Sequence, residues 1–146
     1  MEEYKATLEE MYRQAKKKGA CDKFPVFNGT ENLSELCELM FSPQGREFCL
    51  KHRFPDINTM RTLKKYNLTD YKIYVDAGEI TIYDDNCYLI GNTKATIRLG
   101  VLGLYRCCLM HGAKAHIDAS GYSIINAIAD KKSSFSISTK DNAIIL

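Results

Sequence analysis

Lys94-Ala95-Thr96-Ile97 and Lys114-Ala115-His116-Ile117 decide the fold, because the second stretch repeats the first one 20 residues later. The same shift relates three columns of apolar residues in the C-terminal half of the chain. The first column holds Val75, Ala95, Ala115 and Phe135 beside Ile97, Ile117 and Ile137; the second holds Ile82, Leu102 and Tyr122 beside Leu104, Ile124 and Ile144; the third holds Cys87, Cys107 and Ala127 beside Leu89, Leu109 and Ala129. A fixed period of roughly 20 to 50 residues is typical of solenoids, whose units bury their apolar faces on their neighbours.

Residues 67–146 therefore predict a three-faced β-solenoid, or β-helix, with 20-residue coils. Apolar and polar residues alternate along each repeat, and glycine or Asx residues mark the corners. We expect about three and a half coils, each with three short strands. A right-handed solenoid is favoured because parallel crossovers are right-handed as a rule. An antiparallel meander would also show short strands, but it has no reason to restore the register at every third strand.

Residues 1–66 have helical spacing instead. Helices are predicted over residues 2–18, over 32–40, from a Ser42 cap with Pro43 in the first turn, and from an Asp56 cap to about Leu63. The apolar face of the first helix contains Tyr4, Leu8, Met11, Tyr12 and Ala15. This segment has few large apolar residues for a core of its own. We predict an α+β protein in which a helical subdomain, residues 1–66, packs on the solenoid.

The inward positions fix the outward ones, since side chains alternate along a strand. The first face is predicted to be polar, with Thr96, Arg98, His116, Asp118, Ser136 and Ser138 outward. On it, Arg98 and Asp118 are expected to form an exposed ion pair. The third face is apolar on its outer side as well, with Tyr88, Ile90, Cys108, Met110 and Ile128 outward. We expect the helices to cover this third face.

Composition excludes several classes of partner. The 146 residues have a formal net charge of +2, too small to indicate a nucleic-acid partner. No apolar run reaches the ~20 residues of a membrane span. Met1 leads into a charged amphipathic segment instead of a signal peptide. We therefore expect a cytoplasmic protein whose six cysteines are thiols, with no nucleic-acid or membrane partner.

Two Cys-x-x-His pairs are the only metal-like pattern. Cys49 with His52 and Cys108 with His111 could supply four zinc ligands, but structural zinc sites more often contain closely spaced cysteine pairs. A Cys108 nucleophile with His111 or His116 as its base has only Asp118 nearby to orient the base. We interpret these residues as ordinary buried thiols and surface histidines. The sequence predicts no catalytic residue, metal site or cofactor, and a protein that is not an enzyme.

A resemblance adds a biological context. Tyr74 to Gly78, Leu89 to Thr93, Leu109 to Ala115 and Asp141 to Ile145 resemble segments of small uncharacterised proteins of gut bacteria and their prophages or mobile elements. The resemblance covers most of residues 46–146. It implies a non-enzymatic protein-interaction module, such as an accessory or anti-defence protein of a phage or mobile element. The coils are also similar in length to those of polymer-forming bactofilins, which implies the alternative of a structural, self-assembling protein.

The last predicted strand favours a homodimer. Ile144 and Leu146 would lie beside unpaired backbone groups in the final coil, and exposed strand edges bind other strands. Two-fold pairing is the commonest closed way to bury such an edge. We expect the C-terminal coil to form this contact.

Overall fold

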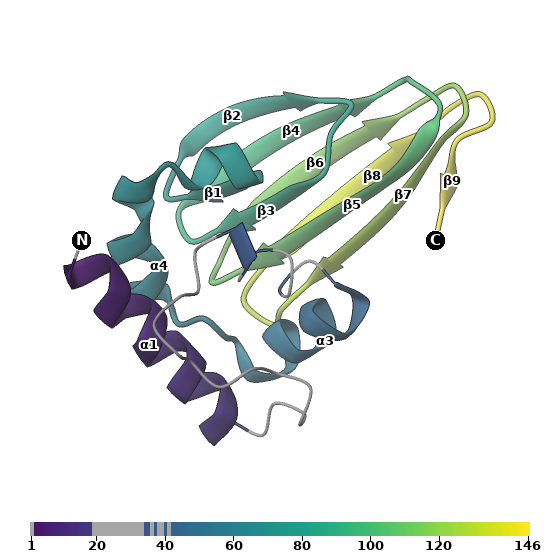
Figure 1. Cartoon of the computed structure of the whole chain (residues 1–146). Coiled ribbons are helices and arrows are strands. Elements are labelled where there is room, and N and C mark those ends of the chain that lie inside the picture. The colour runs from purple at the N-terminus through teal and green to yellow at the C-terminus, as the bar shows by residue number, and fades with distance from the viewer. Residues whose placement is uncertain (1, 19–33, 36, 38–39, 41) are drawn as a thin grey trace. The chain divides into compact units, whose positions relative to one another are not determined.

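The computed structural model describes residues 2–18, 34–35, 37, 40 and 42–146. The chain divides into two compact units, Met1–Asn67 and Leu68–Leu146, which are described separately. The described elements of the first unit are helices, and every described strand belongs to the second unit (Figure 1). The protein is therefore a mixed α+β protein, as predicted.

The first unit contains α1 (Glu2–Lys17), α3 (Pro43–His52), α4 (Ile57–Leu63) and the 3-10 helix η1 (Lys64–Tyr66). Both predicted caps are confirmed. The Gly45 N–H donates to Ser42 Oγ at 3.0 Å, and the Thr59 N–H donates to Asp56 Oδ1 at 2.7 Å. These bonds satisfy backbone donors that the first turn of a helix leaves free. The helix predicted over residues 32–40 falls largely outside the described residues.

The predicted apolar face of α1 is buried wherever its side chains are described, and the side chain of Tyr4 lies outside the described part. Leu8, Met11 and Ala15 are fully covered, and Tyr12 is nearly so. Lys16 and Lys17 lie in the last turn, where cations complement the helix dipole. No helix among the described residues is both long and apolar enough to cross a membrane.

The second unit begins with η2 (Leu68–Tyr71) and continues with strands in two parallel sheets. One sheet has the order β1-β3-β5-β7-β9 and the other β2-β4-β6-β8, so successive strands alternate between the sheets (Figure 1). The strands are β1 (Ile73–Val75), β2 (Gly78–Tyr83), β3 (Cys87–Ile90), β4 (Thr93–Leu99), β5 (Gly103–Met110), β6 (Lys114–Ala119), β7 (Ser123–Ala129), β8 (Ser134–Thr139) and β9 (Ile144–Ile145). Neither sheet closes on itself.

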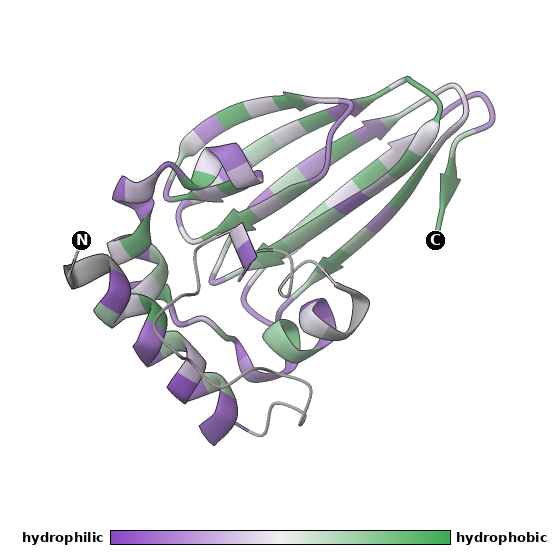
Figure 2. Ribbon diagram, viewed as in Figure 1, coloured by the Kyte–Doolittle hydropathy of each residue, from purple (hydrophilic) through white to green (hydrophobic). Residues whose placement is uncertain are grey.

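From β3 onward, paired residues on neighbouring strands of both sheets are 20 positions apart, which is the shift predicted from the sequence. Cys87 pairs with Cys107 in one sheet, and Ile97 pairs with Ile117 and then Ile137 in the other. Identical or similar side chains therefore lie directly beside each other on neighbouring strands. The inner rows of the two sheets form one apolar core, which includes Leu89, Ala95, Ile97, Leu99, Leu109, Ala115, Ile117, Ala119 and Ile125. Figure 2 shows the alternation of apolar and polar residues along these strands.

The first repeat is shorter than the later ones, and here the prediction is wrong. Val75 pairs with Ile90 and not with a residue of β4, and Ile82 pairs with Ile97 and not with Leu102. The cause is the length of the strands: β3 has 4 residues, whereas β5 has 8. Val75 and Ile82 therefore do not belong to the columns of Ala95 and Leu102.

The prediction of three strands per repeat is also wrong, because each repeat contributes two. Leu104 from the predicted second column and Cys107 and Leu109 from the third lie on one continuous strand, β5. Cys107 and Leu109 point inward, so strict alternation makes Leu104 point outward. Leu104 is accordingly 43% exposed, and Leu102 and Tyr122 at the corners are 76% and 64% exposed. From Leu102 onward, the second predicted column is therefore a surface feature, whereas Ile82 belongs to the core.

The outer side of β3 and of the second half of β5 is buried, as the doubly apolar pattern indicated. Tyr88, Ile90, Cys108 and Met110 are all at most 1% exposed, and Ile128 is half-buried. The packing of residues 1–66 on this face stays a prediction.

Side-chain carboxylates connect the corners of successive repeats. Asp84 Oδ1 accepts hydrogen bonds from the N–H groups of Gly100 at 2.7 Å and Val101 at 3.0 Å. Asp76 Oδ1 accepts from the Asn92 N–H at 2.7 Å in the same way. These bonds satisfy corner N–H groups that the sheet ladders leave without partners.

Two corners approach each other so closely at Gly121 that only glycine fits there. Its φ is +60°, and a Cβ at this position would lie 2.7 Å from the Gly100 carbonyl oxygen. Gly78 also has a positive φ, +69°, but a Cβ there would meet nothing within 4 Å. A substitution at Gly78 therefore meets only the unfavourable positive φ, whereas one at Gly121 meets a steric clash as well.

We predict that Gly121→Ala destabilises the protein more than Gly78→Ala. Gly78→Ala carries only the cost of a left-handed alanine, about 1 to 2 kcal/mol. Gly121→Ala adds the conflict with the Gly100 carbonyl, and we expect a total loss of about 3 kcal/mol or more. Urea unfolding followed by circular dichroism measures both. Equal losses for the two variants would contradict the corner geometry.

Candidate interaction surface

The two Cys-x-x-His pairs do not show the features of a metal centre. Cys49 lies on α3 and is buried, and burial raises the pKa of its thiol to about 12. The ring of His52 on the same helix packs against that of Phe48, with centroids 4.6 Å apart and an interplanar angle of 45°. Among the described residues, no three His, Cys, Asp or Glu side chains are grouped so as to hold a metal ion.

The Cys108 nucleophile considered from the sequence lacks the necessary access. Cys108 is 1% exposed, whereas His116 is an exposed residue on the outer face of the other sheet. His111 lies at the corner after β5, with a positive φ of 59°. The structure therefore separates the thiol from the predicted base His116 and orienting group Asp118.

Cys87 and Cys107 are brought together as expected from their shared column. Their sulfur atoms are 3.4 Å apart, and both side chains are buried. The hydrogen bond to Cys87, followed by burial, raises the pKa of the Cys107 thiol well above its ordinary value. A buried protonated thiol is a poor nucleophile, so these residues act as apolar filling.

The outer face of the β2-β4-β6-β8 sheet is a polar grid in which the strand register aligns three rows. The rows are Glu79, Lys94, Lys114 and Ser134; Thr81, Thr96, His116 and Ser136; and Tyr83, Arg98, Asp118 and Ser138. The sequence predicted the outward position of most of these residues. Arg98 and Asp118 are register partners, but among the described residues no ion pair joins them. The Asp118 carboxylate pairs with His116 instead, so the predicted ion pair is wrong.

His116 connects a serine and a carboxylate on this face. Its Nδ1 lies 2.7 Å from Ser136 Oγ, and its Nε2 lies 3.0 Å from Asp118 Oδ1. The carboxylate can only accept, so Nε2 carries the proton in the neutral ring and Nδ1 accepts from the serine hydroxyl. A hydroxyl, an imidazole and a carboxylate in this order resemble the activation chain of a serine nucleophile.

The surroundings do not complete a catalytic site. The side chains of His116 and Asp118 are 46% and 43% exposed, so water competes for every bond. The N–H groups of Ser134 and Lys140 donate to β6, and the alternation of a parallel strand directs the Ser136 N–H the same way. The backbone N–H of Ser136 is thus not available to stabilise an oxyanion. The chain of bonds is best explained as a contact between neighbouring repeats.

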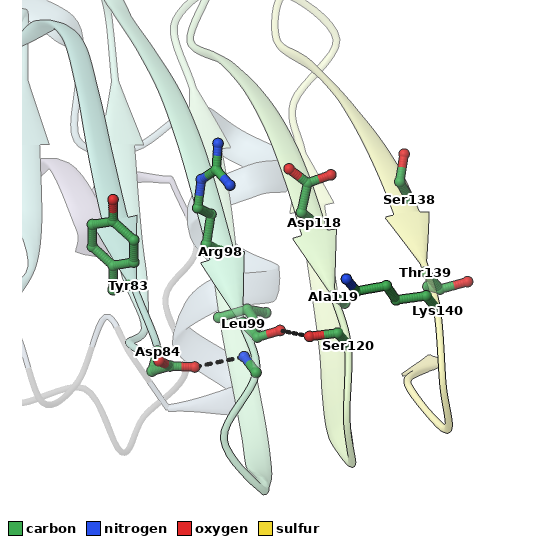
Figure 3. Close-up of a pocket in the computed structure, with 11 residues that line it drawn as sticks. Tyr83, Asp84, Arg98, Leu99, Asp118, Ala119, Ser120, Ser138, Thr139 and Lys140 are labelled. Atoms are coloured by element: carbon green, nitrogen blue, oxygen red, sulfur yellow. Dashed lines mark hydrogen bonds between the residues drawn. The ribbon is translucent and has the colours of Figure 1, made fainter.

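A shallow groove of about 380 Å³ lies at the ends of the same four strands. Arg98, Asp118 and Ser138 line it from adjacent strands, with Tyr83 and Lys140 at its sides (Figure 3). Asp84 at its base is occupied by backbone N–H groups. The groove combines charges of both signs on an open surface, and no single ligand chemistry dominates it.

The other sheet presents an apolar strip on its outer side. Leu104, Ile124 and Ile144 are register partners on β5, β7 and β9. Leu104 and Ile144 are 43% and 53% exposed, and Ile124 is half-buried. Together with the exposed corner residues Leu102 and Tyr122, they form what we call the apolar strip. Sequence reasoning assigned all five to the interior; the parity of β5 was the signal that could have placed them outside.

The comparisons with known proteins give no relative. No family model, no curated protein and no solved structure matches this chain.

Asp130 is a buried carboxylate that holds one corner together. Its oxygens accept from the His111 N–H at 2.8 Å and from the Lys132 N–H at 3.1 Å. Burial alone would raise the pKa of Asp130. The hydrogen bonds from the His111 N–H, the Ser133 hydroxyl and the Lys132 N–H outweigh it and lower the pKa below the ordinary value.

We predict that Asp130→Asn destabilises the protein by about 1 to 3 kcal/mol at pH 7, because charged acceptors bond more strongly. A lowered folded-state pKa contributes stability above the unfolded-state pKa, and this contribution is lost as the pH falls through the folded-state value. The difference between the wild type and the variant should therefore shrink progressively as the pH falls below about 4. Urea unfolding at pH 7 and pH 3 tests this. Asp141→Asn is the control, because exposed Asp141 accepts one longer bond, from the Gly121 N–H at 3.2 Å. A pH-independent difference for Asp130→Asn would contradict the role of its charge.

Proposed function

We propose that residues 67–146 are a right-handed β-solenoid that serves as a non-enzymatic protein-interaction module. Two features support the solenoid. The chain alternates between two parallel sheets, and each return to the same sheet after β3 repeats the register that pairs Cys87 with Cys107 and Ile97 with Ile117. Crossovers between parallel strands are right-handed in about 98% of cases.

The apolar strip is the main support for the proposed binding role. Its side chains are held in line by the backbone register of β5, β7 and β9, so they present a fixed surface without needing an ordering step. Contiguous exposed apolar side chains on a folded protein are typical of contact surfaces. A preformed apolar row suits a protein partner, because binding loses little conformational freedom.

The polar grid supports the non-enzymatic part of the proposal. Its one hydroxyl-imidazole-carboxylate chain is open to water, and the groove beside it is shallow and of mixed charge. Catalytic sites instead exclude water and aim fixed dipoles at the reacting atoms. We assign the grid to the solvated side of the module.

The resemblance of residues 46–146 to proteins of prophages and mobile elements extends the proposal to an accessory or anti-defence role. In that role the partner is a protein of the bacterial cytoplasm. The alternative is a structural protein that assembles with itself, and the free strand edges of the second unit favour self-contact as a separate property.

Photo-crosslinking tests the binding role. A benzophenone amino acid in place of Tyr122 lies within the apolar strip, and one in place of Tyr83 lies on the polar grid. The two tyrosines are matched controls, since they are 64% and 66% exposed. In the natural host we expect a discrete adduct from position 122 and none from position 83.

A second variant ties the adduct to the strip. Leu104→Asp places a charge within the strip, on the strand next to the one that Tyr122 precedes, and should abolish the adduct at position 122, because burying an unpaired charge is unfavourable. Leu104 is already 43% exposed, so the melting temperature should change little. Equal adducts from positions 83 and 122, or an adduct that Leu104→Asp leaves intact, would reject the proposal.

A further inference from the structure

The β8 strand has a free edge. It is the last strand in the order β2-β4-β6-β8, and no other described strand pairs with its outer side. The side chains that β8 directs toward the core are only partly covered: Phe135 is 36% exposed and Ile137 is half-buried. The last layer of the core is therefore open on this side.

The backbone groups on the free edge can be assigned from the register. The Ser134 N–H donates to Ala113, directly before β6, and the Lys140 N–H donates to Ala119 at the end of β6. In a parallel pair, alternate residues face the same neighbour, so the even-numbered residues of β8 bond to β6. The N–H and C=O groups of Phe135, Ile137 and Thr139 consequently point away from the sheet.

β8 lacks the features that protect free edges. Exposed edge strands are usually guarded by charged side chains, proline or a bulge. The six residues of β8, Ser134 to Thr139, contain no charged residue and no proline, and all six pair with β6 without interruption. Its outward side chains, Ser134, Ser136 and Ser138, are small and leave the backbone accessible.

We propose that β8 pairs with β8 of a second copy of the chain, antiparallel and about a two-fold axis at Ile137. This register is self-complementary. Ile137 lies opposite its own symmetry mate and Phe135 opposite Thr139, so the core sides meet. The serine sides meet as well, because Ser136 lies opposite Ser138. The pairing continues both the core and the polar grid into an eight-stranded sheet, and it does not depend on the proposed function.

The opposite end of the unit argues against head-to-tail polymerisation. There η2 packs on β1, so that edge of the first sheet is flanked by a helix. The first repeat is also shorter, since β1 and β3 have 3 and 4 residues. β2 and β8 each have 6 residues, so strand length alone does not oppose a β8 edge stacked on β2 of another copy, and the helix η2 beside β1 is the feature that does. A closed two-fold dimer avoids this obstacle.

The area that the contact would bury can be estimated from the length of β8. Six residues at about 3.3 Å each give an edge about 20 Å long, and two sheets with their side chains give a width of similar size. The contact buries on the order of 800 Å² in total, which is below that of standard stable complexes. The dimer should therefore dissociate measurably on dilution.

Sedimentation equilibrium of the full chain, at concentrations up to roughly 1 mM, tests the proposal. We expect a reversible equilibrium between one and two chains. Thr139→Pro removes an N–H on the free edge and no bond to β6, and proline cannot donate to a partner strand. It should weaken dimerisation at least tenfold with little change in melting temperature.

Thr81→Pro on β2 is the matched control. The Gly78 N–H donates to Asn92, directly before β4, so by the same alternation the Thr81 N–H points away from the sheet, at the opposite edge. This variant should dimerise like the wild type. Weakening by both prolines would indicate head-to-tail pairing of β8 with β2, and a wild type that stays monomeric at the highest concentration would also overturn the proposal.

Discussion

Parallel pairing of each strand with the matching strand of the preceding repeat is the constraint on which the second unit depends. It places Ile117 between Ile97 and Ile137 and Cys107 beside Cys87, so that each repeat is packed by the next one. Because side chains alternate, a slip of one residue would exchange the core row of β6 for Lys114, His116 and Asp118. The cost of burying these charges holds the register in place.

The corners reinforce the same register from outside the sheets. Each connection leaves N–H groups that no strand can satisfy, and carboxylates of neighbouring repeats accept them at Asp76, Asp84 and Asp130. Such bonds form only when consecutive corners are aligned. The positive φ of Gly121, packed against the Gly100 carbonyl, shows how closely two corners approach. Side-chain capping and strand pairing thus specify one arrangement.

The sequence predicted the features that depend only on the local spacing of residues. The caps at Ser42 and Asp56, the constant shift between repeats and the inward rows of Ile97 and Leu109 all follow from local spacing. It misplaced Leu104 and Ile124, since a corner was assumed between two columns that share one strand. Whether a segment such as Gly103 to Met110 stays straight depends on pairing across the sheet, and local pattern does not reveal it. The pairing of His116 with Ser136 and Asp118 in place of an Arg98–Asp118 pair depended on side-chain geometry in the same way.

The two outer surfaces differ in chemistry because of that geometry. The polar grid is satisfied by contacts within its own sheet and by water, whereas the apolar strip and the β8 edge leave apolar side chains such as Leu104 and Phe135 partly exposed to water. The proposed binding role and the proposed dimer therefore belong to separate surfaces. One can be altered without the other.

A nuclear Overhauser spectrum of the full chain tests the central claim, the parallel register, most directly. The account predicts backbone contacts from Ile117 to both Ile97 and Ile137, since adjacent strands lie about 4.8 Å apart. Consecutive strands lie in different sheets about 10 Å apart, so Ile117 and Ile125 should show no close contact between their Hα atoms. Strong Hα contacts between Ile117 and Ile125, as antiparallel pairing of β6 with β7 would give, would contradict it.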